Sequence, residues 1–194
     1  MKLDFWFDFN CDSYESLKSF KEAFDSFKNK DEVTVSFRSI NFNDSTKFHE
    51  TYQFLKKKGL KLEVLLDLFC DYMHKVSINE AIKNISDKYQ VSLDELVLNL
   101  ETEKSKKVIN NHMEHASLQK INQVPTITMS HGYKLVGVLS KEEIKETLIQ
   151  MYEKDAGIEY CEENCERWCE CHLFFVLFTI LKYYMVYLTR LKKM

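Results

Sequence analysis

Cys11 stands in the stretch "FDFNCDSYES", after an apolar run and before a segment with helical spacing. A cysteine thiolate attacks disulfides. A position just before a helix favours the thiolate, because free amide groups and the helix dipole stabilise negative charge. Asp12 opposes this effect by adding a negative charge nearby. The sequence therefore offers Cys11 as a nucleophile for thiol–disulfide exchange, with a half-buried, unreactive thiol as the alternative.

Pro125 is the one proline among 194 residues and lies in "NQVPTITMS". Cis peptide bonds are essentially confined to X–Pro sequences. A trans proline at the first residue of a strand is the alternative interpretation. The order of the predicted elements favours the cis bond, with Val124 and Pro125 facing the end of the first strand.

The sequence of the N-terminal third of the chain predicts a β-α-β unit. Residues 3–9 alternate between apolar and other side chains, which indicates a strand with one better-buried face. From Ser16 the apolar residues recur at three and four positions, which indicates a helix, with Cys11 in the link before it. Residues 33–38 alternate again, so a parallel second strand follows by a right-handed connection.

The sequence that follows this unit predicts helices and then a hairpin. The segment 45–118 has helical spacing throughout, and Ser92 with Glu95 forms a capping box. "TITMS" and "YKLVGV" flank His131 and Gly132, which indicates an antiparallel hairpin, and Ser140 with Glu143 begins a last helix. The sequence therefore predicts an α/β, thioredoxin-like fold: 1–44 and 119–155 form the discontinuous thioredoxin-like domain, 45–118 a helical insertion and 156–194 an atypical tail.

At this point the chain resembles the DsbA family, in the cytoplasmic branch of FrnE-like oxidoreductases and 2-hydroxychromene-2-carboxylate isomerases. The resemblance rests on "FDFNC", the helical run from "LFCDYMHK" to "LVLNL", and "HASLQKINQVPTITMSHGYKLVGVLSKEEIKETL", in that order over about residues 1–153. The redox branch has two cysteines separated by two residues. Here the motif reads Cys11-Asp12-Ser13-Tyr14, so Tyr14, or Ser13 after a shift of one, stands at the second cysteine's place.

The resemblance implies a DsbA-like thiol–disulfide oxidoreductase that acts on protein thiols and disulfides. Without a second cysteine, the mixed disulfide on Cys11 must be resolved by an external thiol, so we expect a monothiol cycle. No cofactor is required, although glutathione would serve as the thiol.

Two alternatives stay open. In the isomerase branch and the kappa-class glutathione transferases, a serine takes this place, and Ser13 or Tyr14 would hydrogen-bond the thiolate of bound glutathione. Hydroxyl residues at a helix start also serve as caps. The second alternative is an inactive adaptor, in which the groove beside Val124 and Pro125 pairs with an extended peptide.

The composition and the N-terminal sequence indicate which partners and which cellular compartment to expect. The net charge is −3 and the pI is near 6.1, which does not favour nucleic acid. The N-terminus has acidic residues inside its apolar run and no small-residue cleavage site, so we expect a cytoplasmic protein with reduced thiols.

Other reactive side chains have simpler interpretations. Cys70 lies on an apolar helical stripe and is expected to be packed. Four histidines, at positions 49, 74, 112 and 115, lack metal-ligand spacing and are interpreted as surface or capping residues. His131 belongs to the hairpin turn and is expected to contact solvent. Residues 56–58 form a lysine run that we interpret as a solvated helix end before Gly59.

The tail changes composition after about Gly157. Cys161, Cys165 and Cys169 repeat every four residues, and Cys171 precedes His172, but the paired spacing typical of zinc sites is absent, so we predict no metal. Residues 173–189 are apolar with one lysine, which makes a marginal membrane span. A membrane tail, a buried or oligomer-forming helix, and a segment foreign to this fold remain the three interpretations; membrane association is not favoured.

Overall fold

The computed structural model describes residues 1–43 and 45–157. The predictions made for the cysteine-rich segment and the apolar segment concern positions beyond 157 and lie outside the described residues. Within the described part of the chain, no helix is both long and apolar enough to cross a membrane.

Four strands form one mixed sheet. They are β1 (Lys2–Phe7), β2 (Thr34–Ser39), β3 (Thr126–Met129) and β4 (Lys134–Val136). Their order in the sheet is β2-β1-β3-β4. β1 pairs in parallel with β2 and antiparallel with β3, and β3 pairs antiparallel with β4. The predicted β-α-β unit and hairpin are both present, so the predicted α/β, thioredoxin-like fold class is confirmed.

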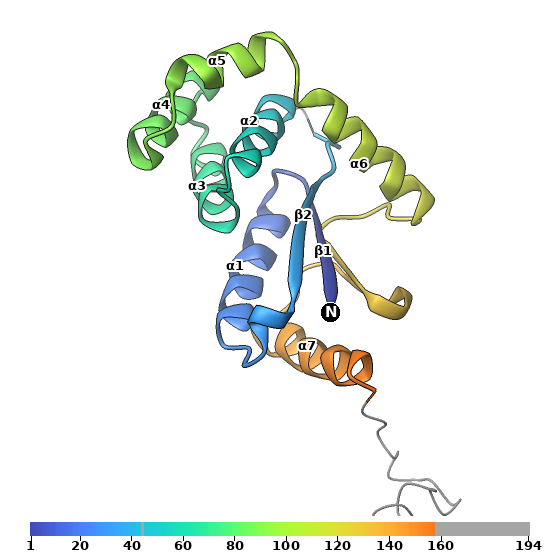
Figure 1. Ribbon diagram of the computed structural model, residues 1–194. Helices are drawn as coiled ribbons and strands as arrows, with labels where there is room; N and C mark the ends of the chain where they lie inside the picture. The colour runs from blue at the N-terminus through green and yellow to red at the C-terminus, as the bar shows by residue number, and fades with distance from the viewer. Residues whose placement is uncertain (44, 158–194) are drawn as a thin grey trace, which may run out of the picture. The chain divides into compact units, whose positions relative to one another are not determined.

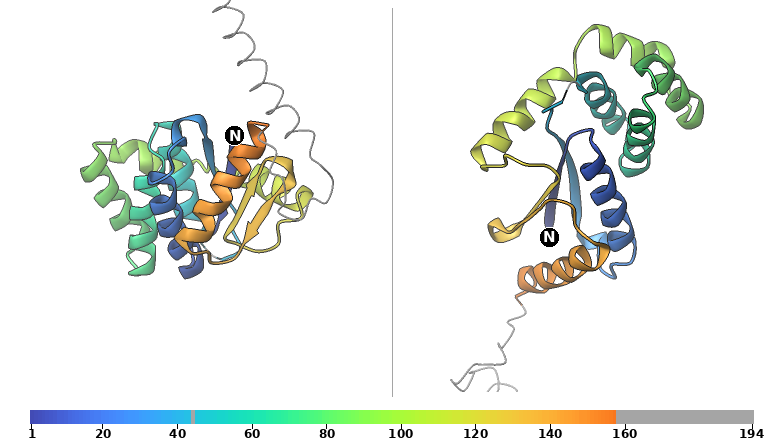
Figure 2. Two further views of the ribbon diagram at one scale, coloured as in Figure 1. Left: turned by 90° about the horizontal axis from the view of Figure 1, so that it is seen from below. Right: turned by 180° about the vertical axis from the view of Figure 1, so that it is seen from behind.

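Seven α-helices accompany the sheet in the described part of the chain (Figure 1). They are α1 (Cys11–Asp25), α2 (Thr46–Lys57), α3 (Leu62–Met73), α4 (Ile78–Tyr89), α5 (Leu93–Glu101), α6 (Lys106–Leu118) and α7 (Lys141–Asp155), counted over residues 1–43 and 45–157. Helices α4 and α5 pack on other helices, away from the strands. Helices α1 and α6 lie on opposite sides of the sheet, as two opposite views show (Figures 1 and 2). Helices α2 to α6 all lie between β2 and β3 in the chain, where the sequence predicts an all-helical insertion over 45–118.

One face of β1 is better buried than the other, as predicted: Leu3, Phe5 and Phe7 are buried, whereas Lys2 is exposed and Asp4 is half-buried on the second face, where Trp6 alone is buried. Leu3, Phe5 and Phe7 enter the main core with residues of α1, α3 and α7. Trp6, on the other face, is fully buried in a second cluster with Ile40, Ala116 and Ile121. Its indole Nε1–H donates to Thr128 Oγ1 at 3.0 Å. The alternation of residue types could not reveal the burial of Trp6. Trp6 is large and apolar, but it alternates with Leu3, Phe5 and Phe7 and was therefore assigned to the less buried face.

The hairpin turn is longer than the predicted two residues. A short 3-10 turn at Ser130–Gly132 joins β3 to β4, and His131 takes a left-handed φ of 57°. The His131 ring also reaches Asp155 at the end of α7, with 3.0 Å between Nε2 and the carboxylate. His131 therefore contacts both solvent, as expected, and the last helix.

The capping box at the start of α7 has both of its arms. The Ser140 side chain accepts from the Glu143 amide, and the Glu143 carboxylate accepts from the Ser140 amide at 2.8 Å. At the start of α5 only the serine arm is present, from Ser92 to the amide of Glu95.

Replacing Ser140 by alanine is expected to lower the free energy of unfolding by about 1 kcal/mol, the usual effect of losing an N-cap. Urea unfolding followed by circular dichroism measures the change. Ser117→Ala, at an exposed position inside α6, is the matched control and should change stability little. Equal effects of the two substitutions would contradict a capping role for Ser140.

Candidate active site

The chain segments whose side chains could take part in a reaction lie together at one end of the strands. Trp6 pairs with both Arg38 in β2 and Thr126 in β3. The segments that leave β1 and β2 and the segment that enters β3 therefore lie together. They are 8–13, 40–43 and 121–125.

Cys11 is exposed and is the first residue of α1. Asn10 is the N-cap: its backbone is extended, and its side-chain oxygen accepts from the Ser13 amide at 2.7 Å. The prediction that the helix begins near Ser16 was wrong, because the apolar spacing starts there while the first turn is polar. The Cys11 thiol is consequently at the N-terminus of α1.

Ser13 and Tyr14 lie in the same first turn but face inwards to different degrees. Ser13 is fully buried, and its Oγ accepts from the Asp8 amide at 3.4 Å. Tyr14 is half-buried, and its ring stacks on Phe69 of α3 with 5.8 Å between the centroids. The Lys18 ammonium lies 4.7 Å from the same ring centroid. Neither side chain is the N-cap of α1, because Asn10 has that role.

The Val124–Pro125 peptide bond is cis. Pro125 is buried, and its carbonyl accepts from the Gly137 amide at 2.9 Å, next to β4. Val124 is half-buried and packs against the cluster that contains Trp6 and Ile40. These contacts hold residues 124 and 125 at the entrance to β3, beside the end of β1.

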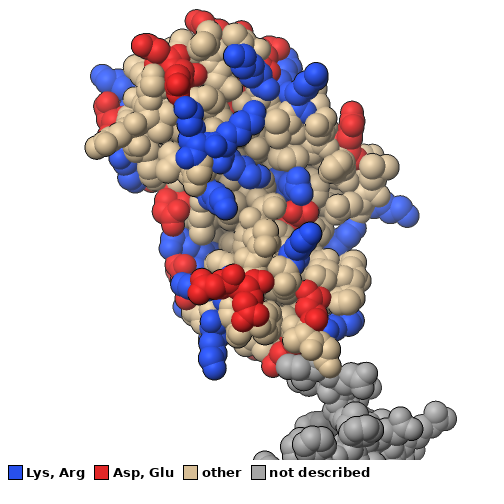
Figure 3. Space-filling view, viewed as in Figure 1, with Lys and Arg blue, Asp and Glu red and all other residues tan. Residues whose placement is uncertain are grey.

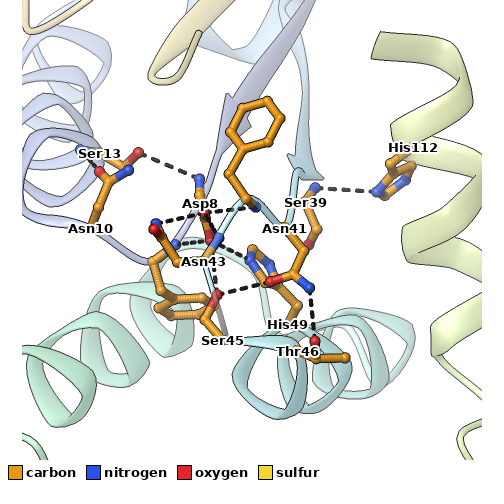
Figure 4. Close-up of polar contacts among 12 residues, drawn as sticks. Asp8, Asn10, Ser13, Ser39, Asn41, Asn43, Ser45, Thr46, His49 and His112 are labelled. Carbon is orange, nitrogen blue, oxygen red and sulfur yellow. Dashed lines mark hydrogen bonds and ion pairs between the residues drawn. The ribbon is translucent and has the colours of Figure 1, made fainter. Parts of the chain in front are cut away.

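Asp8, which the sequence analysis did not propose as a site residue, is the polar centre of this corner (Figure 4). Its side chain is fully buried and accepts six hydrogen bonds. The donors are the amides of Phe9 (2.7 Å), Phe42 (2.9 Å) and Asn43 (2.9 Å), Asn43 Nδ2 (2.8 Å), Ser45 Oγ (2.8 Å) and His49 Nε2 (2.9 Å). Burial alone would raise the pKa of the Asp8 carboxyl, but the bonds from His49, Ser45 and Asn43 lower it below its ordinary value.

The interpretation of His49 and His112 as surface or capping residues was wrong. His49 is fully buried between Asp8 and the rings of Phe7 and Phe9. Burial lowers the pKa of His49 although the bond to Asp8 opposes this, so the neutral ring donates through Nε2. His112 of α6 is also buried, and its Nδ1 accepts from the Ser39 amide at 3.2 Å. An acidic residue inside the apolar run 5–9 was the one available signal for this network.

Acid is expected to destabilise the protein through His112. Burial, with the nearby charges of Arg38 and Lys56, lowers the pKa of His112 from 6.5 to about 3. A histidine whose pKa is lowered on folding is protonated first in the unfolded chain, so stability is lost as pH falls below about 6.5. At pH 5 the 1.5-unit interval corresponds to a loss of about 2 kcal/mol.

Urea unfolding at pH 7 and pH 5 measures this effect. His112→Gln keeps a neutral acceptor but does not titrate. The variant should therefore lose about 2 kcal/mol less than the wild type between the two pH values, while Asp8 and His49 contribute equally to both proteins. Equal losses in the two proteins would contradict the assignment to His112.

The lysine run and Cys70 have more specific contacts than predicted. Lys and Arg side chains gather around α2 and β2 on the face shown in Figure 3. Lys56 is not simply solvated: it is partly buried, donates to the Phe37 carbonyl at 2.8 Å, and burial lowers its pKa to about 8. Cys70 is half-buried rather than fully packed, with its Sγ 3.5 Å from His74 Nδ1.

Known structures share this arrangement of elements. A probable DsbA oxidoreductase from Streptomyces coelicolor, SCO1869, has a TM-score of 0.70 at 14% identity, over 84% of this chain and 93% of that one. The chain has the DsbA-like thioredoxin fold. The oxidoreductase DsbA of Xylella fastidiosa matches at a TM-score of 0.63 and 18% identity, over 80% of this chain and 86% of that one.

The same DsbA-like fold includes an enzyme of another class. The structure of 2-hydroxychromene-2-carboxylate isomerase matches at a TM-score of 0.64 and 12% identity, over 82% of this chain and 100% of that one. No protein-family model and no curated protein sequence matches the chain. The identities are low, so these likenesses establish the fold, which is the one that the sequence resemblance implied.

Proposed function

We propose that this chain is a thiol–disulfide oxidoreductase that works through Cys11 in a monothiol cycle. One observation carries the proposal: an exposed cysteine is the first residue of α1, at the corner with the cis Val124–Pro125 bond, and Tyr14 stands three residues further on. Structural neighbours named as DsbA oxidoreductases support the reaction class. The cycle fits the cytoplasmic location that we propose, where glutathione keeps thiols reduced.

The proposed cycle has two exchange steps. The Cys11 thiolate attacks the glutathione sulfur of a glutathionylated protein, so that a Cys11–glutathione disulfide forms and the protein thiolate leaves and takes up a proton. The thiolate of a second glutathione then attacks the glutathione sulfur on Cys11. Glutathione disulfide leaves, and the Cys11 thiolate is restored. The protein substrate is reduced, and one free glutathione leaves joined to the substrate's glutathionyl group as glutathione disulfide.

The neighbouring residues have separate roles in this proposal. Val124 offers backbone groups to an extended substrate strand, and Pro125 keeps the entrance to β3 in place beside Cys11. Tyr14 occupies the position from which a second thiol would attack. The hydroxyl of Ser13 stabilises the turn from inside, since it is buried and bonded to the Asp8 amide.

A glutathionylated peptide tests the cycle. Without reduced glutathione, the protein should release the peptide thiol once and retain glutathione on Cys11, as peptide mapping would show. With reduced glutathione, release should continue with ping-pong kinetics. Peptide release at the uncatalysed rate, with no adduct on Cys11, would contradict the proposal.

A glutathione-dependent isomerase or transferase is the second candidate, favoured by the likeness to 2-hydroxychromene-2-carboxylate isomerase. It predicts saturable binding of reduced glutathione that survives Cys11→Ser and weakens on Tyr14→Phe. Because Ser13 is buried, its hydroxyl would have to leave the Asp8 amide to reach a bound thiolate. Calorimetric titration of both variants separates this candidate from the monothiol cycle.

A further inference from the structure

Segment 41–43 is joined to the Cys11 turn by a single buried carboxylate. Oδ2 of Asp8 accepts from the amides of both Phe42 and Asn43 at 2.9 Å, while the Asp8 amide donates to Ser13 in the first turn of α1 (Figure 4). A buried carboxylate costs several kcal/mol unless donors surround it. Releasing segment 41–43 would therefore leave this charge without three of its six hydrogen bonds.

A second contact, made by Ile40 immediately before this segment, joins it to the loop that contains Pro125. Ile40 is fully buried in the cluster of Trp6, Ala116 and Ile121, and Val124 packs against that cluster. The Asn41 amide also lies 3.4 Å from Met113 Sδ on α6. The backbone of residues 40–43 is thus fixed between the Cys11 turn on one side and the Val124–Pro125 loop on the other.

Apolar side chains stay exposed on both sides of this corner. Phe42 is 53% exposed although its amide is bonded to a fully buried carboxylate. Beyond Pro125, Val136 and Val138 are 50% and 55% exposed, and they flank Gly137, whose amide donates to the Pro125 carbonyl. A single exposed apolar residue is ordinary, but residues of this kind on either side of the corner that contains Cys11 indicate a surface for an apolar substrate.

We propose that Phe42 is a specificity-determining residue that contacts an apolar side chain next to the substrate's disulfide, and that Asp8 is the positioning residue that holds Phe42 beside Cys11. The inference rests on the proposed monothiol function and adds its substrate class: an extended peptide segment whose glutathionylated cysteine has apolar neighbours.

Two glutathionylated peptides test this inference. In one the cysteine is flanked by leucines, and in the other by glycine and serine. The wild type should have a kcat/KM about fivefold to tenfold higher for the leucine peptide, which corresponds to partial burial of one phenyl ring. Phe42→Ser should bring this ratio close to one by lowering kcat/KM for the leucine peptide.

Leu98→Ser is the matched control, because Leu98 is 52% exposed and lies on α5, away from the residues of the corner. It should keep the wild-type ratio. A wild type without preference, or a Phe42→Ser variant with the wild-type ratio, would overturn the inference while the monothiol cycle stands. Failure of both peptides to react at Cys11 would overturn the cycle and this inference together.

Asp8→Asn tests the positioning role. It keeps the size of the side chain but removes the charge that draws the donors together, so the ratio should fall as in Phe42→Ser while the polar peptide still reacts. A purely structural role would lower both rates equally and keep the ratio, which would overturn the positioning role.

Circular dichroism shows whether this variant folds. If it does not, Asn43→Ala is used in its place. This substitution removes one donor at 2.8 Å from the Asp8 carboxylate and should lower the ratio in part.

Discussion

Replacing Cys11 by serine is expected to bring the glutathione-dependent release of a peptide thiol down to the uncatalysed rate, a loss of about a hundredfold or more. A hydroxyl has the size of the thiol but does not form a disulfide. The loss should therefore occur without a change in stability, because the Cys11 side chain is exposed and its backbone is fixed by the Asn10 cap. Chromatographic separation of the released peptide from its glutathionylated form measures the rate.

Cys70→Ser is the matched control for this prediction. Cys70 is the second thiol among residues 1–43 and 45–157, and it contacts His74 on α3 rather than the Cys11 turn. The four cysteines at positions 161, 165, 169 and 171 are retained in both variants, so any reaction there is common to both. A Cys11→Ser variant that stays active while Cys70→Ser loses activity would show that the thiol had been misassigned.

Placing a cysteine at position 14 is expected to convert the single-thiol site into a dithiol site. In Tyr14→Cys the second thiol would stand three residues after Cys11, in the first turn of α1. An intramolecular thiol acts at a high effective concentration, so it should displace glutathione from Cys11 at least about a hundredfold faster than micromolar to millimolar external thiol does. The Cys11–glutathione adduct should then no longer accumulate, and a disulfide within α1 should replace it.

Tyr14→Ser is the control that distinguishes the effect of the new thiol from the effect of losing the packed tyrosine ring. Both variants remove the ring that stacks on Phe69 and lies under Lys18, so both should lose about 1 to 2 kcal/mol of stability. The adduct should persist in Tyr14→Ser and disappear in Tyr14→Cys, as intact mass measures directly. Persistence of the adduct in both would mean that position 14 does not face the disulfide on Cys11.

The order of elements could be predicted from the sequence because it depends on local periodicity. The change from period two to helical spacing at Ser16, and the capping box at Ser140, are properties of neighbouring residues. The right-handed β-α-β rule and the hairpin link then predicted the topology. The first turn of α1 could not be predicted in this way, since Asn10 caps it through a polar side chain and the turn has no apolar stripe.

The corner around Asp8 could be predicted only in part. Cys11 stands out as a cysteine before a helical segment and Pro125 as the one proline, with Val124 next to it, and the structure brings their segments together. Apart from the amide of Phe9, the groups that donate to the Asp8 carboxylate lie 34 to 41 residues away in the chain, so no local pattern connects them to Asp8. His49 was misjudged for the same reason: a buried histidine is distinguished by its distant carboxylate, and not by its own neighbours in the chain.

The most direct test of the central claim compares Cys11 in the folded protein with Cys11 in the same protein unfolded in urea. Both samples are mixed with glutathione disulfide, and adduct formation at each cysteine is followed by peptide mapping. Folding should make Cys11 react at least about tenfold faster than in urea, and faster than Cys70 in the folded protein, because the start of α1 stabilises the thiolate. If Cys11 reacts no faster when folded, the α1 corner does not activate a nucleophile and the monothiol cycle is wrong.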